Sequence, residues 1–148
     1  MLDSSVAIAA LRDEEPAHEE ARAFMEALRA AAREGRAIVA APAELWLEVY
    51  VVEERLRQSK RAKHAAGSAL AGLAIALWAP REAHEIEAFL AHLAKRMRGR
   101  RAKANGTDLM YLWAGYTAGA AVVTLDEGML GYHLAVCEVM RPAHVRLG

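Results

Sequence analysis

The stretch TDLMYLWAGYTAGAAVVTLDEGML, residues 107–130, carries the most specific pattern in this 148-residue chain. Its first half predicts a helix that is capped by Thr107 or Asp108. The second half changes to AAVVTL, residues 120–125, whose β-branched side chains predict a short buried strand. Asp126 follows this strand directly, and a short helix is expected after it. A helix that leads into a buried strand is a building unit of α/β domains.

The rest of the chain repeats this alternation of helices and short apolar runs. Helices are expected where apolar side chains recur at helical spacing, and strands where short apolar runs are bounded by Gly, Pro or charged residues. Helices are predicted over residues 6–16, 17–34, 42–58, 62–72 and 81–97, and strands over 36–42, 73–80 and 134–140. This order indicates an α/β fold, a three-layer α/β/α sandwich with a mostly parallel central sheet, in one domain over residues 1–148.

Composition narrows the class of protein. A hydrophobic fraction of 55% with 26% charged residues indicates a globular chain, and the 19 basic and 19 acidic side chains cancel, so net charge alone does not indicate a nucleic-acid partner. The single cysteine excludes an internal disulfide and a cysteine-based zinc site, which fits a reducing cytoplasm. No signal peptide is evident, and the uncharged stretches 65–80 and 109–125 are at or below the short limit for crossing a bilayer. A cytoplasmic protein without membrane spans is expected.

Four acidic residues occupy comparable junctions between strands and helices. Asp3 ends a first short strand, and Asp126 ends the strand AAVVTL. Glu48 and Asp108 each lie in the first turns of a helix. Because the carboxyl ends of parallel strands meet at one edge of a sheet, these side chains are expected to converge. Clustered carboxylates repel one another unless a cation compensates them, and oxygen-only ligands favour Mg²⁺ or Mn²⁺, which can activate water for phosphodiester cleavage.

Each acid also has an ordinary structural explanation. The sequence DSS before VAIAAL is a typical helix start, in which Asp3 would be the N-cap and contribute about 1 kcal/mol. Asp108 would likewise cap a helix, and Asp126 would belong to a turn after a strand. The structural and metal-binding roles are compatible, because one carboxylate oxygen can accept a backbone hydrogen bond while the other binds an ion.

Three stretches together resemble the PIN domain, and especially the VapC-type toxins of toxin–antitoxin pairs: MLDSSVAIAAL (1–11), VAAPAELWLEV (39–49) and the stretch 107–130. They run in the family's order along nearly the whole chain. The resemblance implies a compact α/β/α nuclease that uses acidic residues and Mg²⁺ or Mn²⁺ to hydrolyse RNA, leaving a 3′-hydroxyl and a 5′-phosphate. It also implies a homodimer and a small antitoxin protein that blocks the acidic cleft, commonly by inserting an Arg.

The family pattern places catalytic and metal-binding acids at Asp3, Glu48, Asp108 and Asp126. Ser5 and Thr124 stand at the hydroxyl positions that support them. Glu44 lies one helical turn before Glu48 and competes for its role, although the family's spacing favours Glu48. The chain departs from the pattern because only Met1 and Leu2 precede the first acid, so that strand is either clipped or begins upstream. We expect two residues to be enough to hold that aspartate.

Basic residues cluster over 55–63 and 95–103. The first cluster is expected to be solvated surface, whereas the second leads into Asp108 and would position RNA beside the metal through phosphate contacts. Its candidate RNA-binding residues are Arg98, Arg100, Arg101 and Lys103. The alternative function is a PIN-fold module that binds RNA or a protein without cutting. The intact set of four acids argues against that alternative.

Small and aromatic residues give two further expectations. Gly115 and Gly119 are expected to permit close helix packing. Trp46, Trp78 and Trp113 are expected in the core or at a dimer interface, where aromatic side chains are enriched.

Overall fold

The computed structural model describes residues 1–59, 69–99 and 104–147. Its helices are α1 (Ser4–Leu11), α2 (His18–Arg33), α3 (Glu44–Gln58), α4 (Ala83–Arg96), α5 (Gly106–Ala118) and α6 (Glu127–Leu130). Its strands are β1 (Val39–Ala41), β2 (Ile75–Leu77), β3 (Val122–Val123) and β4 (Val139–Met140), and a 3₁₀ turn (Pro142–His144) follows them. The order of elements is as predicted, but the strands are shorter. Of the predicted helix at 62–72 only residues 69–72 are described, and these form turns.

The N-terminal segment joins two strand pairs into one parallel arrangement. β1 pairs with β2, and β3 pairs with β4. Leu2 lies between these pairs: its backbone N donates to the Ala40 carbonyl at 3.0 Å. On the other side, Val123 N donates to Met1 O at 2.9 Å and Asp3 N donates to Val123 O at 3.1 Å. These hydrogen bonds of Met1, Leu2 and Asp3 hold Asp3 at the carboxyl end of a central strand segment.

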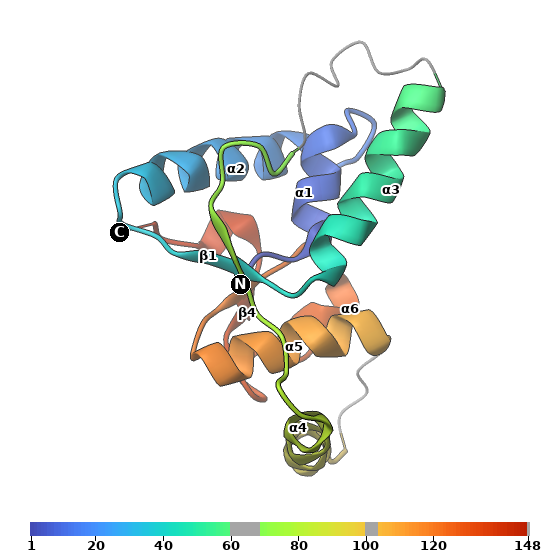
Figure 1. The fold of residues 1–148 in the computed structure, drawn as a ribbon, viewed down its shortest axis with the longest axis vertical. Coiled ribbons are helices and arrows are strands. Elements are labelled where there is room, and N and C mark those ends of the chain that lie inside the picture. The colour runs from blue at the N-terminus through green and yellow to red at the C-terminus, as the bar shows by residue number, and fades with distance from the viewer. Residues whose placement is uncertain (60–68, 100–103, 148) are drawn as a thin grey trace.

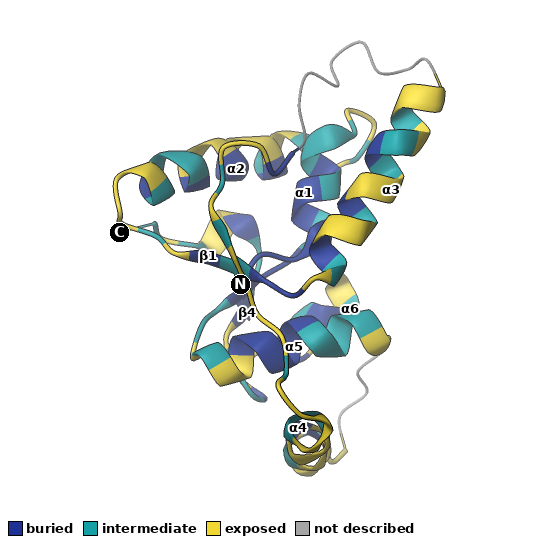
Figure 2. Cartoon of the chain, in the orientation of Figure 1, coloured by how far each residue is buried: buried dark blue, intermediate teal, exposed yellow. Residues whose placement is uncertain are grey.

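Helices cover both sides of these strands. α1, α2 and α3 lie on one side and α4, α5 and α6 on the other, so the predicted three-layer α/β/α fold is confirmed (Figure 1). The buried residues lie on the helix faces that point inward and on β1, β3 and β4, whereas the residues of β2 are intermediate or exposed (Figure 2). Leu2 is 2% exposed and Trp113 of α5 is 1% exposed, so both belong to the core. Trp46 and Trp78 are 37% and 36% exposed and lie at the surface.

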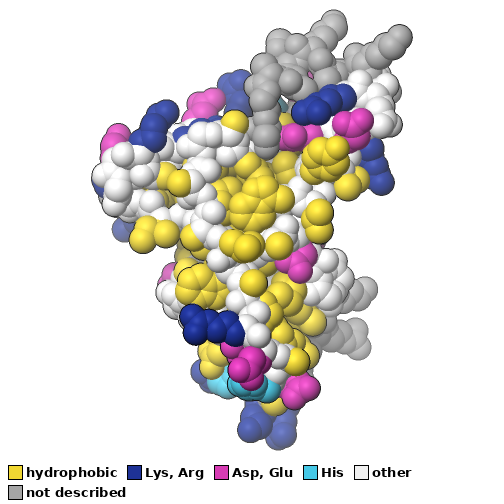
Figure 3. Space-filling model, viewed as in Figure 1, with side chains coloured by type: hydrophobic (Ala, Val, Ile, Leu, Met, Phe, Trp, Pro, Cys, Tyr) yellow, Lys and Arg dark blue, Asp and Glu magenta, His cyan; other side chains and the backbone are white. Residues whose placement is uncertain are grey.

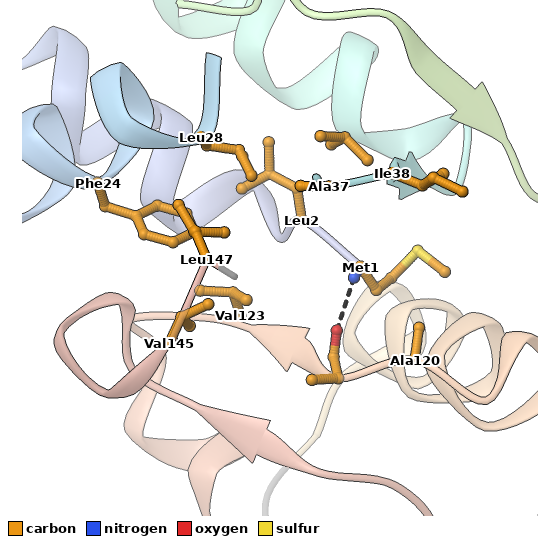
Figure 4. Close-up of a pocket in the computed structure, with 12 residues that line it drawn as sticks. Met1, Leu2, Phe24, Leu28, Ala37, Ile38, Ala120, Val123, Val145 and Leu147 are labelled. Carbon is orange, nitrogen blue, oxygen red and sulfur yellow. Dashed lines mark hydrogen bonds between the residues drawn. The ribbon is translucent and has the colours of Figure 1, made fainter. Parts of the chain in front are cut away.

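An apolar cavity of about 200 Å³ opens at the amino ends of the strands (Figure 4). It is lined by Phe24 and Leu28 of α2 and by Val145 near the C-terminus. The Met1 ammonium donates to the Ala121 carbonyl at 2.6 Å, and burial lowers the pKa of this amino group to about 6. The cavity is at the opposite end of the strands from Asp3. It is therefore separate from the predicted acidic site.

The two glycines of α5 differ in their roles. A Cβ on Gly115 would lie 2.5 Å from Val122 Cγ2 and 3.2 Å from Cys137 Sγ, so the expected close packing is confirmed there. For Gly119 that expectation is wrong, because a Cβ would meet no atom within 4 Å. Gly119 has a φ of +60° and ends α5 in the left-handed conformation, which costs glycine little.

No helix in the described ranges is long and apolar enough to cross a bilayer. The uncharged stretch 109–125 contains most of α5 and the whole of β3.

Gly115→Ala is predicted to destabilise the fold by about 1–3 kcal/mol, because the added methyl group overlaps Val122 unless α5 moves away from β3. Thermal and urea unfolding measure the change. Gly106→Ala is the matched control, since a Cβ at Gly106, also in α5, meets no atom within 4 Å. Equal stability of the two variants would show that α5 does not pack against β3 at this distance.

Candidate active site

The four predicted acids sit where strands end and helices begin. Asp3 follows the central strand segment, and Asp126 is the N-cap of α6, just after β3. Glu48 lies in the second turn of α3, which follows β1. Asp108 lies in the first turn of α5. The charge of Glu48 acts on both Asp3 and Asp108, and the charge of Asp126 acts on Asp108, so the carboxylates are within electrostatic reach of one another.

Two hydroxyl groups orient the Asp3 carboxylate. Asp3 occupies the N-cap position of α1, yet its side chain makes no capping hydrogen bond. Instead, Ser5 Oγ and Thr124 Oγ1 both donate to Asp3 Oδ2, the second over 2.6 Å. Asp3 is 4% exposed and Thr124 is fully buried, so these hydrogen bonds lie in a largely water-free setting. The ordinary explanation of Asp3 as a helix cap is therefore not what its side chain does.

The same hydroxyls are fixed by the turn after β3. Leu125 N donates to Ser5 Oγ at 2.9 Å, and Asp126 N donates to Thr124 Oγ1 at 2.9 Å. A hydroxyl that accepts a backbone N–H has one proton to donate, and here that proton points at Asp3. This geometry supports the roles predicted for Ser5 and Thr124, because their hydrogen bonds to Oδ2 fix the orientation of the Asp3 carboxylate.

Glu48 is held by a residue for which no role was predicted. Tyr111 of α5 donates its hydroxyl to Glu48 Oε2 at 3.1 Å, a contact that joins the two helical layers. Burial, and then the charges of Asp3 and Glu48, raise the pKa of Tyr111, so the phenol stays a donor at neutral pH. Its spacing from Asp108 is the signal that marks it, since residues i and i+3 share a helix face. Among the described residues Glu44 makes no such contact with Tyr111, and the choice of Glu48 over Glu44 stays a prediction.

The cap of α5 was predicted wrongly. The N-cap is Asn105, whose side chain accepts from Asp108 N at 2.9 Å, while Asp108 Oδ2 accepts from Asn105 N at 2.8 Å. This reciprocal capping box satisfies two backbone N–H groups at once, which a cap at Thr107 would not. Asp126 does cap its helix, because Oδ1 accepts from Met129 N at 2.8 Å. Both acids keep a second oxygen outside these bonds.

The PIN domain family model matches residues 1–132 of the 148. The chain belongs to the PIN domain family. PIN domains are in general nucleases, so the chain has a nuclease-type fold. Searches of curated proteins and of solved structures found no match.

Two of the predicted site acids of this PIN domain, Asp3 and Asp108, have raised pKa values. Burial raises the pKa of Asp3 above its usual range, and the charge of Glu48 adds to the effect, while the hydroxyls of Ser5 and Thr124 oppose it. Burial also raises the pKa of Asp108, helped by the charges of Asp126 and Glu48. Desolvation and like charge both disfavour the ionised form. A bound cation would relieve both.

The donor chemistry fits Mg²⁺ or Mn²⁺. In the part of the chain that is described, no three His, Cys, Asp or Glu side chains are arranged as a group that could hold a metal ion. A closed protein cage is therefore absent there. Mg²⁺ does not require one, because it keeps several waters and takes one or two carboxylates from the protein. The oxygen-only acids at this edge match such a hydrated ion.

The predicted RNA-binding cluster is only partly visible. Arg98 is exposed just after α4. Arg100, Arg101 and Lys103 lie outside the described residues. The described chain resumes at Ala104, directly before the Asn105 cap of α5.

Asp3→Asn is predicted to stabilise the metal-free protein at pH 7. The folded-state pKa of Asp3 lies above its unfolded value, so folding favours the protonated form. The stability of the parent therefore falls as pH rises through the folded-state pKa, and the advantage of the variant shrinks as pH falls toward 4. Thermal unfolding in EDTA between pH 4 and pH 7 measures the difference in stability between variant and parent. Each kcal/mol shifts Tm by about 2–4 °C.

Glu87→Gln, at an exposed position of α4, is the control and is expected to show no such trend. A lower Tm for Asp3→Asn than for the parent at pH 7 in EDTA would contradict the account of a destabilising buried charge.

Proposed function

We propose that this PIN domain is a Mg²⁺- or Mn²⁺-dependent endoribonuclease, the toxin of a VapBC-type toxin–antitoxin pair. The observation that carries the proposal is the buried Asp3 carboxylate, which two hydroxyls orient and whose pKa the charge of Glu48 helps to raise. An aspartate held in this way has a raised pKa and a fixed direction. These are properties of a ligand-binding group more than of a structural one.

The chain's own residues would share the work of binding and orientation. Asp3 would hold the ion with one or more of the acids Glu48, Asp108 and Asp126, directly or through water. When bound, the ion supplies a water of lowered pKa and stabilises charge on the phosphate. Ser5 and Thr124 keep Asp3 from rotating, because both hydroxyls bond the same oxygen. Tyr111 keeps Glu48 at the same edge.

Cleavage of a labelled single-stranded RNA in Mn²⁺ tests the proposal. The parent is expected to cut, and to stop cutting in EDTA. Asp3→Asn and Asp108→Asn are each expected to lose at least 100-fold in rate, because each removes a charge that attracts the ion. Glu44→Gln is the matched control for Glu48→Gln, because the two glutamates lie one helical turn apart on α3 and, of the two, Glu48 contacts Tyr111.

Cleavage by Asp3→Asn and Asp108→Asn at the parent's rate would overturn the assignment. RNA binding without cleavage by the parent, together with no uptake of millimolar Mn²⁺, would indicate the non-catalytic binding module instead.

The proposal includes a homodimer, an antitoxin partner and a cytoplasmic location. Exposed apolar side chains support a protein partner: Leu47, Tyr50 and Val51 of α3 are 68%, 61% and 45% exposed, and Leu77 of β2 is 61% exposed. Hydrophobic side chains gather on the face of the molecule shown in Figure 3. A short neighbouring gene for a DNA-binding antitoxin would favour the toxin over a housekeeping nuclease.

A further inference from the structure

Arg141 directly follows β4, next to the turn that carries Thr124. β3 and β4 pair in the register Val123↔Met140, and Thr124 N donates to Met140 O at 3.0 Å. The next pair in this register is Thr124 with Arg141. Arg141 lies just past the end of β4, with an extended backbone (φ −74°, ψ 154°), and Pro142, which has no N–H to donate, ends the pairing after it. It lies outside the residues 1–132 that match the PIN family.

The central strand segment brings Asp3 to an equivalent position. Leu2 forms a parallel bridge with Val123, which puts Asp3 level with Thr124. Asp3, Thr124 and Arg141 are therefore each the first residue after the paired positions Leu2, Val123 and Met140. Residues in register on neighbouring strands project to the same face.

The guanidinium of Arg141 is poorly satisfied. Its Nη1 contacts Glu127 Oε1 at 3.1 Å, and this is its one ion pair or hydrogen bond within the described ranges. Its Nε is buried and has no hydrogen-bond partner there. The Glu127 side chain is 74% exposed, and a solvated pair of this kind is weak. Glu127 is the first residue of α6 and follows Asp126, the N-cap of that helix, so the pair starts one residue from a predicted site acid.

The negative charge of an RNA backbone that approaches this edge must be compensated by a cationic group. Four carboxylates repel the phosphates, and an ion held by them compensates the scissile phosphate alone. The planar fork of Arg matches the geometry of a phosphate, and its five donors exceed what one carboxylate can use. A phosphate at Arg141 would gain donors that Glu127 leaves unsatisfied.

We propose that Arg141 binds an RNA backbone phosphate beside the scissile one, and that Glu127 occupies the guanidinium until RNA displaces it. This inference rests on the proposed ribonuclease function. It makes Arg141 a positioning residue that holds the strand in register with Asp3, and it makes Glu127 a competitor of the substrate.

Opposite changes in the two partners test the proposal. Affinity for a labelled single-stranded RNA is measured by fluorescence anisotropy in an Asp108→Asn background, where cleavage is blocked. Arg141→Gln is expected to weaken binding about tenfold and to make the slope of log K against log[salt] less steep by about 0.7, the value for one phosphate contact on a single strand. Glu127→Gln is expected to tighten binding, and Arg141→Lys to fall between Arg141→Gln and the parent.

Steady-state cleavage in the unaltered background gives a second readout. Arg141→Gln should raise KM more than it lowers kcat, because the contact is made as RNA binds. Arg12→Gln is the control: Arg12 forms a comparable pair with Glu15 after the far end of α1, and its loss should change neither quantity. Melting curves establish that each variant folds, and the milder Arg141→Lys keeps the test valid if Arg141→Gln does not.

Unchanged affinity and salt slope in Arg141→Gln, with a parent that binds and cleaves RNA, would overturn the inference alone. Weaker binding in both Arg141→Gln and Glu127→Gln would also overturn it, because the pair would then be structural. A parent that neither binds nor cleaves RNA would overturn the proposed function, and this inference with it.

Discussion

Three backbone hydrogen bonds of Met1, Leu2 and Asp3 hold this fold together at its centre. Leu2 bonds to Ala40 on one side, and Met1 and Asp3 bond to Val123 on the other. Without them, β1–β2 and β3–β4 would be two separate two-stranded units, and such small units are marginal on their own. The segment that joins the sheet is also the segment that ends in Asp3. Structural continuity and the acidic site therefore depend on the same few atoms.

The cost of this arrangement is electrostatic. A carboxylate at the end of a central strand is buried, and burial raises the pKa of Asp3. The fold offsets part of that cost with hydroxyl donors from Ser5 and Thr124, which are themselves anchored by the backbone of the following turn. Tyr111 does the same for Glu48 from the opposite helical layer. What remains uncompensated is an excess of negative charge at one edge, which is the condition that attracts a divalent cation.

Much of this architecture was predictable from the sequence, and the failures have physical causes. The alternation of helices and apolar runs gave the three layers, and strand ends located Asp3. The cap of α5 was misplaced because Asn105 and Thr107 are both good caps, and only the reciprocal bond to Asp108 decides between them. No role was predicted for Arg141, because its place next to Thr124 depends on strand register, which a two-residue strand does not reveal in its sequence.

Our central claim is that Asp3 and its neighbouring acids form a cation site. An anomalous difference map from crystals soaked in Mn²⁺ tests it most directly. We predict a peak at a bonding distance of about 2 Å from the Asp3 carboxylate, with at least one of Glu48, Asp108 or Asp126 bound directly or through water. A well-ordered site at this edge with no peak, or a peak elsewhere on the molecule, would contradict the claim.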